Sequence, residues 1–259
     1  MINSKVTSAP TERADLRPSA DSDTPLNAQP VLHAADVFKS YQDIELSILN
    51  GVSLDVARSE TVAIMGRSGC GKSTFISMLA GLDRADRGVI EILGEPINRM
   101  PSRELNRFRA SRIGIIFQQF HLLEHLTAFE NIRLPLDLNR VANSDEVARA
   151  MLKKVRLDHR ADHFPNQLSR GECQRVAIAR VLVMRPAIIL ADEPTGSLDV
   201  RTGHDVMELL FDLVEREKIA LVMATHDPRI AEKCSRLLYM SEGTLSASRP
   251  ADFAIGWSP

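Results

Sequence analysis

The sequence predicts an α/β fold in which a parallel β-sheet carries helices on both faces. Four short apolar runs do not alternate with polar residues, as is typical of strands buried on both sides. These runs are TVAIM (61–65), IGIIF (113–117), AIILA (187–191) and IALVMAT (219–225). Helical patterns lie between them, at residues 72–82, 144–157 and 203–218. Strands that alternate with helices indicate a parallel sheet.

Two further regions adjoin this core. Residues 31–60 and 88–94 show short β-like segments with turn signals, which predict a small antiparallel β-subdomain. Residues from about 119 to 180 are mainly helical and predict an α-helical subdomain inserted between the second and third strands. We therefore expect one domain over residues 31–245. A disordered tail is expected at residues 1–30, which lack an apolar signal-like segment, and an irregular C-terminal tail is expected at residues 246–259.

Composition and charge narrow the possible functions. The 259 residues include 32 basic and 34 acidic side chains, a net charge of −2, so no general positive field favours nucleic acid. The 3 cysteines lack metal-type spacing, which favours a reducing compartment such as the cytoplasm. No apolar run approaches the ~18 residues that span a bilayer, so any membrane role is expected to depend on a partner.

Each of the four predicted strands ends in a glycine or a polar residue. Gly66, Gln118, the pair Asp192 and Glu193, and His226 follow them in order. Ligands of open α/β sheets bind outside the carboxyl ends of the strands. The sequence therefore predicts a single site at this edge. Taken alone, a histidine such as His226 at a strand end is more often a surface or capping residue, and Gln118 alone is a weaker signal still.

The segment GRSGCGKS (66–73) fits the pattern G-x-x-x-x-G-K-[ST] between a strand and a helix. In such a phosphate loop, backbone N–H groups and the helix N-terminus bind phosphate. Lys72 would contact the terminal phosphates and Ser73 would bind Mg²⁺. A nucleoside triphosphate is the expected ligand.

The segment AIILADEP (187–194) supplies two acids at a buried strand end. Asp192 would organise Mg²⁺, and Glu193 would accept a proton from an attacking water. The alternative is a solvated strand end, which the phosphate loop makes less plausible.

A third motif, LSRGECQ (168–174), combines helix-capping and phosphate-binding features. Ser169 and Glu172 have the spacing of a capping box, in which each side chain bonds a free N–H at a helix start. The same free N–H groups, a hydroxyl and Gly171 could also receive a phosphate. Both readings use the same backbone groups.

These motifs in this order resemble ATP-binding-cassette (ABC) ATPase subunits. GRSGCGKS resembles Walker A, IFQQF (116–120) the Q-loop, LSRGECQ the signature, and AIILADEP Walker B. SLD (197–199) resembles the D-loop and ATHD (224–227) the H-loop. Segments such as LTAFENIRLPL and LADEPTGSLD are most similar to the lipoprotein-releasing and macrolide-exporter branch, of LolD and MacB type and including YbbA-like members.

The resemblance implies a head-to-tail homodimer with ATP between the phosphate loop of one subunit and the signature of the other. Gln118, Glu193 and His226 would be catalytic, and Ser73, Gln118 and Asp192 would bind Mg²⁺. Asp199 would lie at the dimer contact. The implied ATP-binding residues are Tyr41, Gly66, Arg67, Ser68, Gly69, Cys70, Gly71, Lys72, Ser73 and Thr74, with Ser169, Arg170, Gly171 and Glu172 acting on the partner's ATP.

Transport is the function that the resemblance implies. The chain would hydrolyse ATP and drive separate permease subunits from the cytoplasmic face of the membrane, without a nucleic-acid partner. One alternative is a soluble ABC ATPase acting on nucleic acid or ribosomes, although the chain has one cassette and no basic bias. Another is a P-loop kinase, which would not hydrolyse ATP without an acceptor.

Two residues depart from simple expectation. Arg170 stands where family signatures usually have glycine; it either points away from the nucleotide or adds charge near the phosphates. We expect the first, because a long side chain would crowd the approach that Gly171 permits. Cys70 lies inside the phosphate loop, where alkylation is expected to block nucleotide binding.

Overall fold

The computed structural model describes residues 29–41 and 46–250. Most of the predicted N-terminal tail and residues 251–259 lie outside this part, so both tails remain predictions. Within it, no helix is long and apolar enough to cross a membrane.

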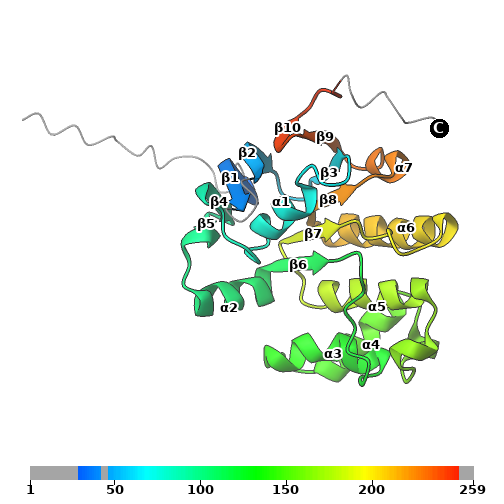
Figure 1. Cartoon of the computed structure of the whole chain (residues 1–259). Helices are drawn as coiled ribbons and strands as arrows, with labels where there is room; N and C mark the ends of the chain where they lie inside the picture. Colours follow the sequence, from blue (N-terminus) through cyan, green and yellow to red (C-terminus); the bar gives the residue numbers. More distant parts are fainter. Residues whose placement is uncertain (1–28, 42–45, 251–259) are drawn as a thin grey trace, which may run out of the picture.

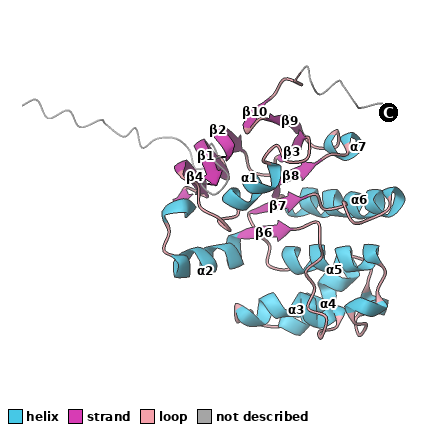
Figure 2. Cartoon of the chain, in the orientation of Figure 1, coloured by secondary structure: helices cyan, strands magenta, loops and turns pink. Residues whose placement is uncertain are grey.

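Two sheets organise the molecule (Figures 1 and 2). The larger has the order β10-β9-β3-β8-β7-β6, and the smaller has the order β2-β1-β4-β5. The larger contains β3 (Thr61–Gly66), β6 (Ile113–Ile116), β7 (Ile188–Asp192), β8 (Ala220–Thr225), β9 (Arg236–Ser241) and β10 (Thr244–Ser246). The smaller contains β1 (Leu32–Tyr41), β2 (Leu46–Val56), β4 (Arg87–Ile92) and β5 (Glu95–Pro96).

Strand pairing confirms both predicted sheets. β6, β7, β8, β3 and β9 are parallel neighbours, whereas β1 pairs antiparallel with β2 and β4. The α/β fold class is therefore confirmed. β9 and β10 were not predicted, because the segment 236–246 mixes polar residues among its apolar ones and lacks the unbroken runs of the central strands.

Some helices pack on the larger sheet, and others form a separate group beyond β6. The helices are α1 (Lys72–Leu79), α2 (Ser102–Arg112), α3 (Ala128–Leu138), α4 (Ser144–Lys154), α5 (Arg170–Leu182), α6 (Val200–Glu217) and the short α7 (Pro228–Ala231). Helix α2 was not predicted; its sequence has one buried apolar residue, Leu105, and so lacks a strong apolar stripe. Single-turn 3-10 helices occur at Ile97–Arg99, Asp158–Arg160 and Pro165–Gln167.

Side chains of the central strands alternate between two cores. In β7, Ile188 and Leu190 face the core shared with α1 and the smaller sheet, whereas Ile189 and Ala191 face the core shared with α3–α6. This burial on both faces explains why the runs read as continuous apolar segments. Figure 1 shows α1 beside the smaller sheet and α3, α4 and α5 grouped beyond β6. These three helices form the predicted helical insertion; its boundaries at 119 and 180 remain predictions.

Candidate active site

The phosphate loop connects β3 directly to α1. Gly69 and Gly71 adopt φ values of 82° and 106°, in the left-handed region that favours glycine. A Cβ on Gly71 would stand 2.9 Å from the Ile48 carbonyl oxygen, so a side chain there would clash with the backbone of β2. Glycine is thus required both for the turn and for the packing of the loop against the smaller sheet.

Lys72 is the first residue of α1 and is buried, with 5% of its surface exposed. Its ammonium group donates hydrogen bonds to the carbonyl oxygens of Gly66 (2.8 Å) and Arg67 (2.9 Å). The charge therefore lies inside the curve of the loop, where a phosphate would compensate it. Ser68 and Gly69 at the tip of the loop are exposed, and Thr74 is half-buried in the first turn of α1.

Ser73, in the first turn of α1, meets Asp192 at the end of β7. The Ser73 hydroxyl donates to Asp192 Oδ1 at 2.9 Å. Burial, together with the nearby Glu193 charge, raises the pKa of Asp192, although the Ser73 hydrogen bond opposes this shift. A partly desolvated carboxylate beside a hydroxyl matches the hard oxygen ligands that Mg²⁺ prefers.

Glu193 follows Asp192 in a strained conformation. Its φ of 44° is unusual for a non-glycine residue, and its N–H donates to the Ala224 carbonyl at 3.0 Å. This backbone geometry directs the side chain toward the end of β8, where His226 Nδ1 lies 3.3 Å from Glu193 Oε2. The structure thus brings together the predicted acid and histidine.

Gln118 lies just beyond β6, against the segment that follows Walker B. A Cβ on Gly196 would stand 2.7 Å from Gln118 Nε2, and Ser197 Oγ donates to the Gln118 carbonyl at 3.1 Å. Among the described residues, no hydrogen bond joins the Gln118 side chain to Ser73 or Asp192. The predicted role of Gln118 in binding metal remains a prediction.

The signature begins α5 with the predicted capping box. Glu172 N donates to Ser169 Oγ at 3.3 Å, and Ser169 N donates to Glu172 Oε2 at 2.8 Å. Arg160 also contacts the Glu172 carboxylate at 3.0 Å. Burial would raise the pKa of Glu172, but the hydrogen bonds from Ser169 and Arg160 outweigh it and lower the pKa.

The signature lies at the start of α5, in the group of helices α3, α4 and α5 (the helical group), away from the phosphate loop of the same chain (Figure 1). Ser169 and Arg170 are exposed, whereas Gly171 is buried. A Cβ on Gly171 would lie 2.5 Å from Thr202 Cγ2 of α6. Glycine at this position therefore has a packing role within the chain, which sequence reasoning missed.

Tyr41 ends β1, next to residues that the structure does not describe. Its hydroxyl donates to Asp83 Oδ2 at 3.0 Å, and the Lys39 ammonium lies 5.1 Å from the ring centroid. Burial and the Asp83 hydrogen bond raise the pKa of Tyr41. Tyr41 is 40% exposed, which leaves its ring accessible for the predicted stacking on adenine.

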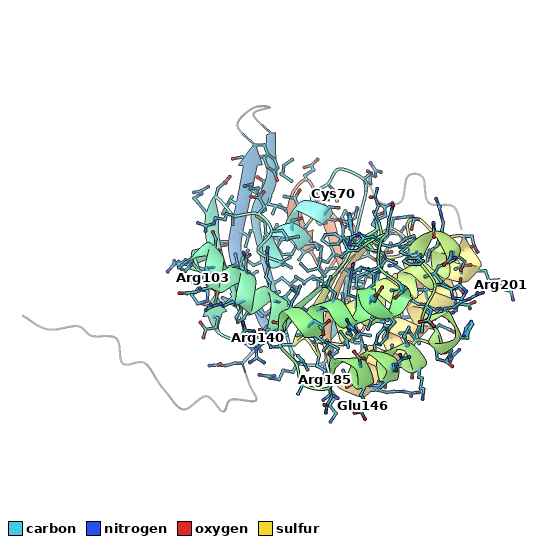
Figure 3. The ribbon with its side chains drawn as sticks, turned by 90° about the horizontal axis from the view of Figure 1, so that it is seen from below. Cys70, Arg103, Arg140, Glu146, Arg185 and Arg201 are labelled. Atoms are coloured by element: carbon cyan, nitrogen blue, oxygen red, sulfur yellow. The ribbon has the colours of Figure 1, made fainter. Side chains whose placement is uncertain are left out.

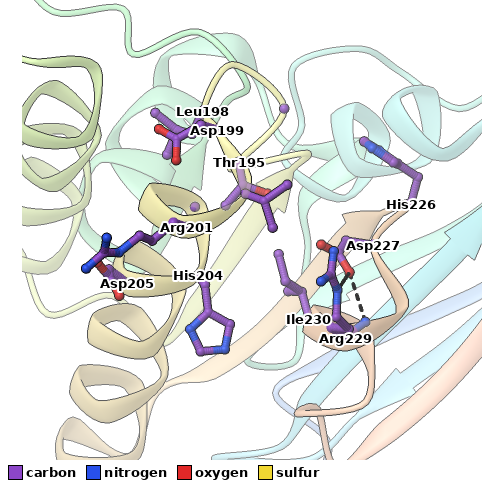
Figure 4. A pocket seen from close by; sticks show the side chains of 13 residues that line it. Thr195, Leu198, Asp199, Arg201, His204, Asp205, His226, Asp227, Arg229 and Ile230 are labelled. Atoms are coloured by element: carbon purple, nitrogen blue, oxygen red, sulfur yellow. Dashed lines mark hydrogen bonds and ion pairs between the residues drawn. The ribbon is translucent and has the colours of Figure 1, made fainter. Parts of the chain in front are cut away.

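Asp199 caps α6, accepting a hydrogen bond from Thr202 N at 3.0 Å. It lines a pocket of about 480 Å³ between the start of α6 and the segment after β8, with His226 at one side (Figure 4). The pocket also includes Leu198 and Asp227. The D-loop and the H-loop thus border one opening.

Arg180, near the end of α5, is a residue that sequence reasoning missed. Its guanidinium donates to the carbonyl oxygens of His121 (2.7 Å) and Phe120 (3.0 Å), three and two residues after Gln118. Burial lowers the pKa of Arg180. The sequence did contain a signal for it, because Arg180 lies among the apolar residues on the buried side of the predicted helix. A guanidinium in that position needs carbonyl or carboxylate partners.

The three thiols differ in environment. Cys70 is half-exposed in the phosphate loop, and a Cβ on Gly66 would lie 2.5 Å from its sulfur. Burial raises the pKa of the Cys173 thiol and raises that of Cys234 to about 12. The expected effect of Cys70 alkylation remains a prediction.

Comparison with known proteins defines the class. The profile of the ABC transporter family matches residues 49–196, more than half of the 259-residue chain. The chain therefore belongs to the ABC transporter family.

Individual relatives define the branch. The chain is 45% identical over 203 residues to "Uncharacterized ABC transporter ATP-binding protein YbbA" of Escherichia coli (strain K12), covering 78% of this chain and 89% of YbbA. It is 43% identical over 223 residues to "Lipoprotein-releasing system ATP-binding protein LolD" of Alcanivorax borkumensis, covering 85% and 98%. It is an ATP-binding, ATP-hydrolysing subunit of the LolD and YbbA type, as the motifs predicted.

A solved structure supports the same assignment. "Dimeric structure of a post-hydrolysis state of the ATP-binding cassette MJ0796 bound to ADP and Pi" superposes with a TM-score of 0.76 at 37% identity, covering 85% of this chain and 100% of that chain. A second, cbiO1 from Clostridium perfringens, described as part of the ABC transporter complex cbiONQ, gives a TM-score of 0.75 at 30% identity.

Proposed function

We propose that two copies of this chain bind two ATP molecules head to tail and hydrolyse them to drive separate permease subunits. The observation that carries the proposal is the division of the site. Ser73, Asp192, Glu193 and His226 meet at the sheet edge, whereas Ser169 and Arg170 are exposed on the helical group. A signature that lies away from its own phosphate loop is free to complete the site of a second subunit. The dimeric state of MJ0796 agrees with this arrangement.

ATP would be held mainly by the phosphate loop. Backbone N–H groups of residues 66–74 and the N-terminus of α1 would face the phosphates, with Lys72 beside them. Tyr41 would stack on the adenine ring. From the other subunit, the Ser169 hydroxyl and the free backbone N–H groups at the start of α5 would close over the γ-phosphate.

Mg²⁺ would be held by Ser73, Asp192 and Gln118. The ion would neutralise charge that develops on the phosphates during transfer. The Ser73 and Asp192 oxygens already lie side by side, which suits a small cation that prefers oxygen ligands. Gln118 would have to leave Gly196 to join them.

Glu193 and His226 would carry out the hydrolysis. Glu193 would take a proton from the attacking water. The oxygen of that water would bond to the γ-phosphorus as the bond between the γ-phosphorus and the departing ADP oxygen breaks. His226 would contact the γ-phosphate and, through its 3.3 Å approach to Glu193, orient that carboxylate. Asp199 at the start of α6 would join the dimer contact between the two sites.

The permease would dock on the helical group. Leu123, Leu138 and Val141 expose apolar surface there, with 74% of Leu138 accessible. Gln118 lies five residues before Leu123, so docking would shift a segment that leads directly into the active site. We place the subunit at the cytoplasmic face of the membrane through this contact, in a system of the export or lipoprotein-release type.

The test uses the variant Glu193→Gln, which preserves the shape of the side chain but cannot accept the proton. We expect it to bind ATP, to form a stable dimer measured by light scattering, and to retain a membrane protein during purification from membranes. Glu146→Gln, an exposed change on α4, should hydrolyse ATP and dimerise only transiently. A Glu193→Gln protein that binds ATP and stays monomeric would contradict the proposal.

A further inference from the structure

Arg170 links the start of α5 to the loop before α6 within one subunit. Its Nη1 donates a hydrogen bond to the Ser197 carbonyl at 2.9 Å. One residue later, Gly171 packs so closely on α6 that a Cβ would lie 2.5 Å from Thr202 Cγ2. Two adjacent signature residues therefore lie against the first residue of the D-loop (residues 197–199) and against α6 just after it.

Ser197 extends this connection to the Q-loop. While its carbonyl accepts from Arg170, its hydroxyl donates to the Gln118 carbonyl at 3.1 Å. The Gln118 side chain lies against Gly196, where a Cβ would approach Nε2 to 2.7 Å. Signature, D-loop and Q-loop thus form one hydrogen-bonded chain, and Arg170 supplies its first bond.

The geometry points away from a phosphate-binding role for Arg170. Its guanidinium is turned toward a carbonyl of its own chain, and reaching a partner's ATP would break that bond. A glycine or other short residue at this position could not make the connection. Arg170 therefore adds a contact that a glycine-containing signature lacks.

We propose that Arg170 is a positioning residue that holds the signature and the D-loop in a fixed relation before the second subunit binds. The inference rests on the proposed dimer, in which both segments face the partner. Because the signature and the D-loop are already fixed, less conformational entropy is lost when the two subunits associate. Arg170 would therefore lower the ATP concentration at which the dimer forms, and would leave the chemical step unchanged.

The first measurement is hydrogen exchange in the nucleotide-free subunit. In Arg170→Ala, amides of residues 196–199 should exchange faster, while those of the central strands should not change. Arg103→Ala is the control, because it removes an exposed arginine from α2. Arg103 lies across the molecule from Arg201, which is close to the D-loop in sequence (Figure 3), so exchange in the D-loop should not change. Unchanged exchange in Arg170→Ala would overturn the proposal.

The second measurement follows dimer formation in the Glu193→Gln background. Arg170→Ala should raise the ATP concentration for half-maximal dimerisation roughly three- to tenfold, the scale of one hydrogen bond. Arg170→Lys, which can still donate to the Ser197 carbonyl, should recover most of the loss. With Glu193 intact, Arg170→Ala should raise the KM for ATP and leave kcat within about twofold.

The outcomes separate the alternatives. A fall in kcat at saturating ATP, without faster D-loop exchange, would make Arg170 a phosphate ligand and overturn the inference. Faster exchange with unchanged dimerisation would overturn its role in assembly. If no variant dimerises, including Glu193→Gln alone, the dimer proposal fails, and the exchange measurement still decides whether Arg170 holds the D-loop. Arg170→Gln repeats each test if the alanine variant folds poorly.

Discussion

The Ser73 hydroxyl donates to Asp192 Oδ1 at 2.9 Å, across 119 positions of sequence. This bond joins the first residue after the phosphate-loop lysine to the acid at the end of β7. Strand β8 lies between β3 and β7, so the two residues approach above its carboxyl end. The magnesium ligands proposed for this site are therefore brought together by strand order and not by any local motif.

Replacing Asp192 with asparagine should stabilise the nucleotide-free protein while abolishing Mg²⁺-dependent hydrolysis. The folded-state pKa of Asp192 is raised, mainly by burial. A raised pKa means that this group contributes stability that is complete below its unfolded pKa and is lost as the pH rises through the folded value. At neutral pH the buried, charged carboxylate therefore lowers the free energy of unfolding, and the neutral asparagine removes this destabilisation.

Thermal unfolding at two pH values checks this prediction. The gain in melting temperature for Asp192→Asn should be larger at about pH 8 than at about pH 4, close to the ordinary pKa of an aspartate. The exposed change Asp162→Asn should show no such difference. An equal gain at both pH values, or a loss at pH 8, would show that Asp192 is not held at such a cost.

Gly171→Ala should destabilise the subunit by about 1–3 kcal/mol, because the added methyl group overlaps Thr202 Cγ2. In a helix without this contact, the same change is expected to stabilise by reducing the freedom of the unfolded chain. Chemical denaturation of the nucleotide-free protein measures the sign directly.

The companion change Thr202→Ser isolates the cause. It removes Cγ2 and keeps the Thr202 backbone N–H that bonds Asp199. The double variant Gly171→Ala, Thr202→Ser should regain most of the lost stability. If the double variant is no more stable than Gly171→Ala alone, the packing explanation is wrong.

Arg180→Ala should destabilise the fold by about 1–3 kcal/mol, because it leaves the Phe120 and His121 carbonyl oxygens without their guanidinium donor. Lysine should restore only part of this, since a single ammonium lacks the fork that serves two carbonyls. Hydrogen exchange of residues 119–123 and denaturation are the measurements.

The exposed pair of Arg216 and Asp212 supplies a control for Arg180. Arg216→Ala also removes one positive charge from a helix, yet should change stability by less than about 0.5 kcal/mol. Equal effects of the two alanine variants would mean that general charge, and not the bonds to the Q-loop, explains the result.

Most of the candidate site residues could be predicted because they belong to short, local sequence motifs. The phosphate loop needs glycines, a lysine and a helix start within eight residues, and the capping box of Ser169 and Glu172 spans a single turn. The central strands were found because burial on both faces leaves unbroken apolar runs. Strands β9 and β10 were not predicted because polar residues interrupt their apolar runs.

The sequence by itself determined the fold class, the strand-end site and the helix start that carries the signature. Each depends on backbone geometry and burial within one segment, which the residue types specify directly. Only the tertiary structure decided that Ser73 bonds Asp192, that Gly171 packs on Thr202, and that Arg170 bonds Ser197. Those contacts join segments whose proximity follows from strand order and helix packing, so no local pattern contains them.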